Sequence, residues 1–282
     1  MSKTLFNLKV NNPGAVPKFA KDIIWTGLRA TAQFRTLPNF LIIGGQKCGT
    51  TSLYSYLSAH PQILLSLKKE PSYFGDNYCK GVNWYRAHFP LEVTRRLTAR
   101  NAQSPVMVGE ASTASLFHPC AAEQAFKTNN KFKIVVMTRE PVSRAISHYF
   151  FYRKKGMEVR PIERAFSEAC STFTSDLETW RNWNGTISAL ESKIDTYLIR
   201  GLYDQQLEQW QNYFGQQNVL RLKSEEFSSN SELELEKVSE FLGINTFQPI
   251  TTKRFNKGQY KDVPDSVSEQ LREFFQNASG KY

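Results

Sequence analysis

Five short apolar runs, separated by longer stretches of mixed polarity, dominate the hydrophobic pattern of this 282-residue chain. They cover residues 40–43, 63–67, 106–108, 132–138 and 218–222. The run from Phe132 to Thr138 is nearly continuous, as expected for a parallel strand that is buried on both faces. Strands that alternate with helical segments predict an α/β fold. We expect a single domain with a central, mostly parallel five-stranded sheet flanked by helices.

The segments between these runs carry helix signals. Pro141 suits the first turn of a helix that passes through Ser147. Residues 160–215 are rich in aromatic residues and predict a helical region. Leu233–Leu242 predicts a further helix, closed by Gly243.

Residues 1–36 look like a basic arm ahead of a domain that covers residues 37–282. The arm holds six lysines and arginines and one acid, Asp22. Its apolar positions after Pro17 could form one helical stripe of Phe19, Ile23, Ile24, Leu28 and Ala32. Such a basic amphipathic helix can make weak contact with a membrane surface, or it can dock on its own domain, which is the more common case.

A glycine-rich loop, Gly44–Ser52, joins the first predicted strand to a predicted helix. This plan is that of a phosphate cradle, because glycines let backbone amides converge and the helix N-terminus adds partial positive charge. A Walker loop places its lysine directly after the second glycine, whereas this chain has Thr50 there and carries Lys47 earlier. That arrangement suits a ligand with a 5′-phosphate and one further group better than a magnesium-bridged triphosphate. A plain glycine turn is the alternative interpretation.

Composition points to anionic ligands. The formal net charge is +10 and the isoelectric point is about 9.4, which favours anionic partners or simple surface solvation. No nucleic-acid-binding motif accompanies the charge, so we do not expect nucleic acid. The four cysteines lack the spacing of a zinc site or a disulfide framework, and no apolar run approaches the roughly 20 residues of a membrane span. We therefore expect a cytoplasmic protein without a metal or a transmembrane segment.

The loop sequence IIGGQKCGTTSL resembles the 5′-phosphosulfate loop of sulfotransferases that use 3′-phosphoadenosine 5′-phosphosulfate (PAPS). The similarity is nearest the branch of heparan sulfate glucosaminyl N- and 3-O-sulfotransferases and their bacterial relatives. It continues in order through KKEPSYF, GEAS, MTREPVSRAISHY, RGLYDQQL and a C-terminal NKG, over roughly residues 37–275. Several motifs in the right order are more specific than one loop. The resemblance implies transfer of a sulfuryl group from PAPS to an acceptor hydroxyl or amine.

The resemblance also implies roles for individual residues. Lys47 matches the lysine at the bridging oxygen, and Glu70 matches the glutamate that acts as catalytic base. Arg139 and Ser147 match the 3′-phosphate motif. The residues expected to bind the nucleotide are Lys47, Cys48, Gly49, Thr50, Thr51, Ser52, Arg139, Ser147, Lys257 and Gly258. Lys257 and Gly258 could belong to a loop that closes over the 3′-phosphate, or to an ordinary exposed turn.

Departures from the resembled enzymes bear on the acceptor. Ser72 stands where many relatives have histidine, Gly75 stands where some have aspartate, and Ala111 replaces an acceptor-side lysine. A cysteine-bridged C-terminal loop is also absent from the sequence. We therefore do not expect heparan itself, and a bacterial-type saccharide or a polar small-molecule natural product fits better. A guanidinium alkaloid toxin is an alternative acceptor, which Glu110, Asp176 and Glu178 could face.

Two other function classes stay open. A P-loop kinase or NTPase would need ATP, magnesium and a lysine directly before Thr51, which this chain lacks. A non-catalytic nucleotide or polyanion binder would use the basic surface and would be indifferent to Glu70.

Overall fold

The computed structural model describes residues 18–247 and 263–278, which are organised around a five-stranded parallel sheet. The strands are β1 (Phe40–Gly44), β2 (Ile63–Leu65), β3 (Met107–Ala111), β4 (Lys133–Thr138) and β5 (Val219–Lys223). Their order is β2-β3-β1-β4-β5, and every neighbouring pair is parallel. The predicted α/β fold is confirmed, with a sheet that is entirely rather than mostly parallel.

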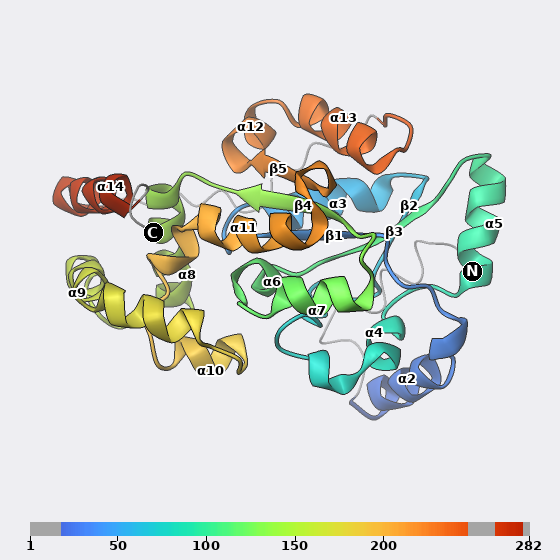
Figure 1. The fold of residues 1–282 in the computed structure, drawn as a ribbon, viewed down its shortest axis with the longest axis horizontal. Helices are drawn as coiled ribbons and strands as arrows, with labels where there is room; N and C mark the ends of the chain where they lie inside the picture. Colours follow the sequence, from blue (N-terminus) through green and yellow to red (C-terminus); the bar gives the residue numbers. More distant parts are fainter. Residues whose placement is uncertain (1–17, 248–262, 279–282) are drawn as a thin grey trace.

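Helices cover both faces of this sheet. The longer ones are α2 (Lys18–Ala30), α3 (Thr50–Ala59), α5 (Glu92–Ala102), α7 (Ala121–Thr128), α8 (Pro141–Lys154), α9 (Ile162–Arg181), α11 (Tyr203–Phe214), α13 (Ser231–Leu242) and α14 (Asp265–Ala278). The short ones are η1 (Ala32–Phe34), η2 (Tyr78–Lys80), α4 (Val82–Arg86), α6 (Ala114–Phe117), α10 (Ile187–Glu191), η3 (Ile199–Gly201), η4 (Gln216–Asn218) and α12 (Ser224–Ser229). In Figure 1, α12 and α13 lie on one side of the sheet, and α6 and α7 lie on the other.

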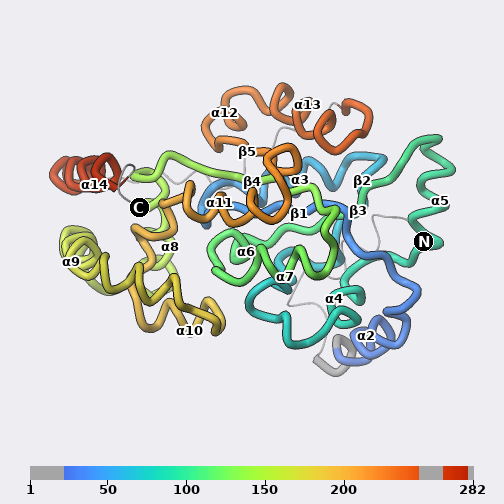
Figure 2. Tube along the Cα trace, in the orientation of Figure 1, coloured from blue at the N-terminus to red at the C-terminus, as the bar shows by residue number. Residues whose placement is uncertain are grey.

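The carboxyl ends of the strands face a second group of helices. The arrow of β4 points towards α8, and α9, α10 and α14 gather around α8 at that end of the molecule (Figures 1 and 2). These helices share an apolar cluster of their own, distinct from the cluster around the sheet. The edge of the sheet where ligands bind in open α/β folds therefore lies between two packed cores.

The region 160–215 is helical, but it is broken into several pieces. Helix α9 ends at Arg181, and a turn at Trp183 and Gly185 separates it from α10. A β-carbon on Gly185 would lie 2.8 Å from the Trp183 ring, so this close turn depends on glycine. The sequence pattern predicted helix type here and missed these breaks.

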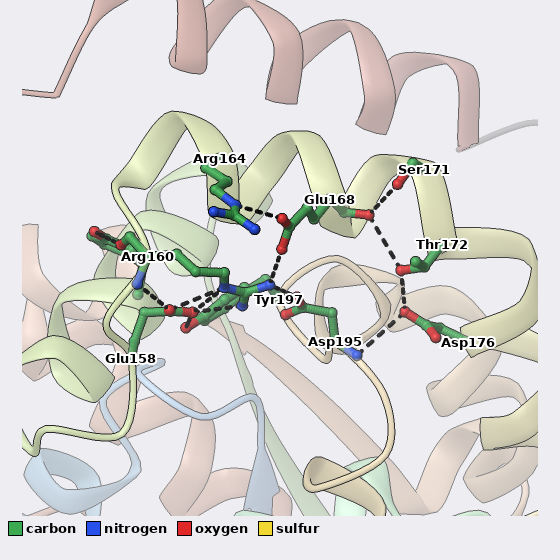
Figure 3. A network of polar contacts seen from close by, with 10 residues as sticks. Glu158, Arg160, Arg164, Glu168, Ser171, Thr172, Asp176, Asp195 and Tyr197 are labelled. Carbon is green, nitrogen blue, oxygen red and sulfur yellow. Dashed lines mark hydrogen bonds and ion pairs between the residues drawn. The ribbon is translucent and has the colours of Figure 1, made fainter.

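An ion-pair network ties the C-terminal side of α8 to α9 (Figure 3). The Arg160 guanidinium contacts three carboxylates, those of Glu158, Glu168 and Asp195, at 2.6, 2.9 and 2.9 Å. Burial of the Glu158 carboxylate tends to raise its pKa, but hydrogen bonds from Arg160 and Tyr197 outweigh this and lower the pKa to about 2. The network holds the tyrosine whose backbone oxygen accepts a hydrogen bond from Arg144 of α8. It thereby fixes the helix that follows the central strand.

The N-terminal helix α2 docks on the domain with only part of the predicted stripe buried: Leu28 is half-buried, and Ala32, just after the helix, is buried. The Trp25 ring packs on the His88 ring at 4.7 Å between centroids. Ile23 and Ile24 are 56% and 46% exposed. The predicted stripe is therefore wrong in part, because Trp25, the residue after Ile24, makes the contact with the domain. Among the helices of residues 18–247 and 263–278, none has the length and apolar character needed to cross a membrane.

Candidate functional site

The glycine-rich loop lies where the sequence predicted it, between β1 and α3 at the carboxyl edge of the sheet. Helix α3 begins at Thr50 after Gly49, which has φ of 87°. Lys47 also has a positive φ, 76°, which is uncommon for a residue with a side chain. The loop therefore carries a local conformational cost, which is typical of backbone held for ligand binding.

Backbone amides of the loop are available to an anion. The amides of Gln46, Lys47, Gly49, Thr50 and Thr51 make no hydrogen bond to other described residues. Unpaired amides at a helix N-terminus, together with the helix dipole, form an anion-binding site. The loop thus offers unpaired amides to an anion, and the phosphosulfate group stays the predicted ligand.

Cys48 faces inward rather than towards a ligand. Its side chain is fully buried, its backbone amide donates to the Gly45 oxygen at 3.1 Å, and its sulfur lies 3.2 Å from the Tyr203 hydroxyl. Burial raises the pKa of the thiol to about 11. A β-carbon on Gly45 would lie 2.7 Å from this sulfur. Cys48 therefore packs the loop against the RGLY segment. Its amide and its thiol both have partners within the protein, so neither is free for the predicted contact with the nucleotide.

Four cations lie close to the loop. Burial lowers the pKa of Lys47, and the nearby positive charges of Arg139, Lys155 and Lys154 lower it further. An Arg139 Nη1 donates to the Lys47 backbone oxygen at 3.4 Å. The Lys47 ammonium lies 4.6 Å from the centre of the Phe151 ring on α8. This accumulation of like charge favours a ligand with several negative charges.

Lys154 and Lys155 were missed by the sequence reasoning. They lie at the end of α8, which follows Arg139, and the fold returns them to the loop. The run Arg153-Lys154-Lys155 is visible in the sequence, but a basic run at a helix end is usually only solvated surface. Only the packing of α8 against the loop shows that the positive charges of Lys154 and Lys155 lie close enough to lower the pKa of Lys47.

The predicted 3′-phosphate pair belongs to the unit that follows the central strand. Arg139 comes directly after β4, and Glu140 caps α8 by accepting from the Val142 and Ser143 amides at 2.9 and 2.7 Å. Ser147 lies in the second turn of α8 and is buried. Lys257 and Gly258 lie outside the described residues.

Glu70 lies on the other side of the loop, in a tight turn beside β3. Strand β1 has β3 as one neighbour and β4 as the other, so the loop stands between Glu70 and Arg139. The Glu70 amide donates to the Ala111 oxygen at 2.9 Å. The carboxylate is 43% exposed and pairs with the Lys69 ammonium at 2.7 Å. An exposed carboxylate at this edge can accept a proton from a bound acceptor.

A second carboxyl group, that of Glu110 on β3, is buried beside this turn. It is 1% exposed. Burial raises its pKa to about 7, hydrogen bonds from Ser112 and Tyr85 act in the opposite direction, and the charge of Glu70 raises it further. A buried carboxyl group with a strongly raised pKa is often found at functional sites.

The structure explains one departure from the resembled enzymes. Gly75 has φ of 98°, and a β-carbon there would lie 2.4 Å from the His118 ring. Because this space is filled, an aspartate could not replace Gly75 without moving the histidine.

The carboxylates of Glu110, Asp176 and Glu178, which could face a cationic acceptor, do not form one site. Asp176 is buried in α9, where it accepts hydrogen bonds from Thr172 and the Asp195 amide. Glu178 is exposed on the same helix, and Glu110 lies on β3, away from α9 (Figure 1). The structure thus removes the residue set that motivated a guanidinium acceptor. In residues 18–247 and 263–278 we find no cluster of three or more His, Cys, Asp or Glu side chains suited to a metal ion.

Comparison with known proteins agrees with the resemblance seen in the motifs. The family model described as Sulfotransferase domain matches residues 37–281. The chain is 31% identical over 231 residues to heparan sulfate glucosamine 3-O-sulfotransferase 3B1 of Mus musculus, covering 82% of this chain and 52% of that protein. It is 25% identical to the membrane-associated sulfotransferase kil1 of Dictyostelium discoideum, covering 96% of this chain and 70% of that protein.

A solved structure shares the fold of this chain. The sulfotransferase from Alicyclobacillus acidocaldarius superimposes with a TM-score of 0.60 at 27% identity, covering 86% of this chain and 92% of that one. The chain spans about half the length of the mouse relative, 52%.

Proposed function

This chain belongs to the sulfotransferase domain family, and we propose that it moves a sulfuryl group from PAPS to a hydroxyl or amine of a saccharide or polar small molecule. One observation carries the proposal: four cations surround a loop of unpaired amides, and an exposed carboxylate lies across that loop. The cations match a doubly phosphorylated nucleotide, and the carboxylate matches a base for the acceptor.

The transfer balances without a redox step. The acceptor oxygen or nitrogen attacks sulfur, the bond from sulfur to the bridging oxygen breaks, and 3′-phosphoadenosine 5′-phosphate (PAP) leaves. Glu70 takes the acceptor proton. Lys47 and the loop amides would stabilise the negative charge that develops on the leaving 5′-phosphate, as fixed donors do in other group transfers.

A saccharide acceptor has support from the relatives, whose names include heparan sulfate glucosamine 3-O-sulfotransferases. The missing acceptor-side lysine argues against heparan itself, because Ala111 is buried and offers no charge. We therefore propose a smaller or less charged acceptor.

We expect PAPS and a panel of amino sugars, saccharides and polar natural products to give a product heavier by one sulfo group. Mass spectrometry with and without a chelator checks this. Magnesium-dependent turnover of ATP with no sulfated product would favour the kinase or NTPase alternative. Nucleotide binding with no product from any acceptor would favour a non-catalytic binder.

We also expect PAP to bind much more tightly than adenosine 5′-phosphate, because we propose that Arg139 contacts the 3′-phosphate. Replacing Arg139 with alanine should reduce this preference by about 1.5–3 kcal/mol, the range for a hydrogen bond to a charged group. Titration calorimetry measures both ligands. Arg181→Ala, which changes an exposed arginine on α9, is the matched control. An unchanged preference in Arg139→Ala would remove Arg139 from this role.

Weak contact with a membrane surface is a further proposal for the region of α2. Its support is the exposure of Ile23 and Ile24 on a helix that also carries Arg29 in its last turn, and a relative described as membrane-associated. Sedimentation with anionic lipid vesicles, compared with neutral ones, tests it. The cytoplasmic location stays a prediction.

A further inference from the structure

The buried carboxyl group of Glu110 has no part in the proposed transfer, yet it lies beside the turn that carries the proposed base. Glu110 is the fourth residue of β3, and β3 is hydrogen-bonded to β1, the strand that leads into the loop. A carboxyl group this deeply buried is costly unless it is hydrogen-bonded. The hydrogen bonds of Glu110 indicate what it holds in place.

A short chain of hydrogen bonds connects Glu110 to this turn. The Ser112 hydroxyl donates to Glu110 Oε2 at 2.6 Å. The same hydroxyl oxygen accepts from the Ser72 amide at 3.0 Å. Because a hydroxyl has one proton, donation to Glu110 leaves the oxygen lone pairs for the Ser72 amide. On its other oxygen, Glu110 accepts from the Tyr85 hydroxyl at 3.3 Å.

The turn itself needs such support. Glu70 and Ser72, on either side of Pro71, have φ of 59° and 48°. The left-handed region is unfavourable for a residue with a side chain, because its β-carbon crowds the backbone. The turn is held by the bond from the Glu70 amide to Ala111, by the Ser72 bond to Ser112, and by the Asn77 side chain on the Pro71 oxygen. Two of these supports come from the end of β3, and Asn77 adds two more by donating to the Ser72 oxygen from its backbone amide and its side chain, both at 3.1 Å.

We propose that Glu110 is a positioning residue for Glu70, which it holds at the reacting edge through the Ser112 hydroxyl and the Ser72 amide. This inference rests on the proposed function only in treating Glu70 as the base. Glu110 touches neither substrate, and its effect on transfer passes through the geometry of the turn.

The charges that face Glu110 give the arrangement a pH dependence. Glu70 and Lys69 face it from the turn, Tyr85 faces it from α4, and Tyr54 faces it from α3. The pKa of Glu110 is about 7, above the ordinary 4.5 of a glutamate. The contribution of Glu110 to folding stability is therefore fully present below about pH 4.5 and is lost as the pH rises through about 7.

Ionisation has the opposite effect on the local bonds. An ionised carboxylate only accepts, so it fixes the Ser112 proton towards itself and leaves the oxygen for Ser72. A protonated carboxyl group can donate to Ser112 and compete with the Ser72 amide. We therefore expect transfer to gain from ionisation of Glu110, so that kcat rises through about pH 7 while thermal stability falls.

The test combines Glu110→Gln, Ser112→Ala and the double variant with a matched buried control, Glu234→Gln. Glu234 is 2% exposed and pairs with Lys237 on α13, far along the chain from the turn. Each single variant should lower kcat on the order of tenfold, the effect of losing one hydrogen bond of ordinary strength. The double variant should be little worse than either single one, because both remove the same support. The step in kcat near pH 7 should vanish in Glu110→Gln, and affinity for PAP should stay unchanged.

Hydrogen exchange of the segment 68–76 supplies a measurement that needs no turnover. Both single variants should speed exchange there, and Glu234→Gln should not. Faster exchange with no transfer to any acceptor, even in the unchanged protein, would support the positioning role and contradict the proposed function. Normal exchange and normal kcat in Glu110→Gln, or multiplied losses in the double variant, would overturn the positioning role and leave the proposed function intact.

Discussion

Replacing Lys47 with methionine is expected to lower kcat for sulfuryl transfer by about 10²–10³, the usual cost of removing one fixed group that stabilises developing charge. Lys47 is half-buried in the loop, and its ammonium has Arg139, Lys154 and Lys155 for neighbours. Methionine keeps an unbranched stem against the Phe151 ring and removes only the charge. Single-turnover kinetics with PAPS measure the chemical step separately from product release.

The matched control for this experiment is Lys131→Met. Lys131 is exposed in the turn before β4, at the opposite edge of the sheet from the loop. Lys47→Met should keep most of its affinity for PAP, because the loop amides and Arg139 remain. A variant that binds PAP and transfers at the normal rate would mean that another cation acts at the leaving oxygen. Lys154 and Lys155 would be the next candidates.

Much of the fold could be predicted because strands and helix ends are local features of the sequence. The run Phe132–Thr138 corresponds to β4, and the signals at Pro141 and Gly243 mark the start of α8 and the end of α13. A buried parallel strand must be apolar on both faces, and a helix end needs a residue that tolerates its geometry. These demands act on single positions, so they can be read from one sequence.

The remaining features depend on contacts between distant segments. The sequence could not show that Lys155 returns to Lys47, or that Ser112 would hold the amide of Ser72, because neither pair is local. The arm illustrates the same limit: an apolar stripe predicted docking, but which residues dock depends on the position of His88. Cys48 is similar, since only the approach of Tyr203 shows that its thiol faces inward.

The groups proposed to act in the transfer lie on two sides of the loop. Lys47 of the loop and the cations of the β4–α8 unit lie together where we propose that the nucleotide binds, and the carboxyl groups of β3 and of the turn after β2 lie where we propose that the acceptor binds. Because β1 lies between β3 and β4, the loop that would hold the phosphosulfate lies between these two sets of groups. In-line transfer needs the attacking and leaving atoms on opposite sides of sulfur, and this arrangement allows that.

Replacing Glu70 with glutamine is expected to lower kcat by about 10²–10⁴, the usual contribution of a general base. Glutamine keeps the size and a hydrogen-bonding oxygen but cannot take a proton near neutral pH. The Glu70 carboxylate is 43% exposed and its contact with Lys69 is a surface ion pair, which contributes about 0–1 kcal/mol to stability. Melting temperature and affinity for PAP should therefore change little. Steady-state kinetics, thermal melting and calorimetry on one preparation separate these quantities.

The alternative role for Glu70, a structural ion pair beside the sheet, makes the opposite forecast: a lower melting temperature with turnover retained. Glu178→Gln, which changes an exposed glutamate on α9, controls for the loss of one negative charge. Normal kcat in a folded Glu70→Gln enzyme that still binds PAP would remove Glu70 from the mechanism. Glu110 would not simply take its place, because it is 1% exposed and its two oxygens already accept from Ser112 and Tyr85. The base would then have to come from the acceptor itself or from water at this edge of the sheet.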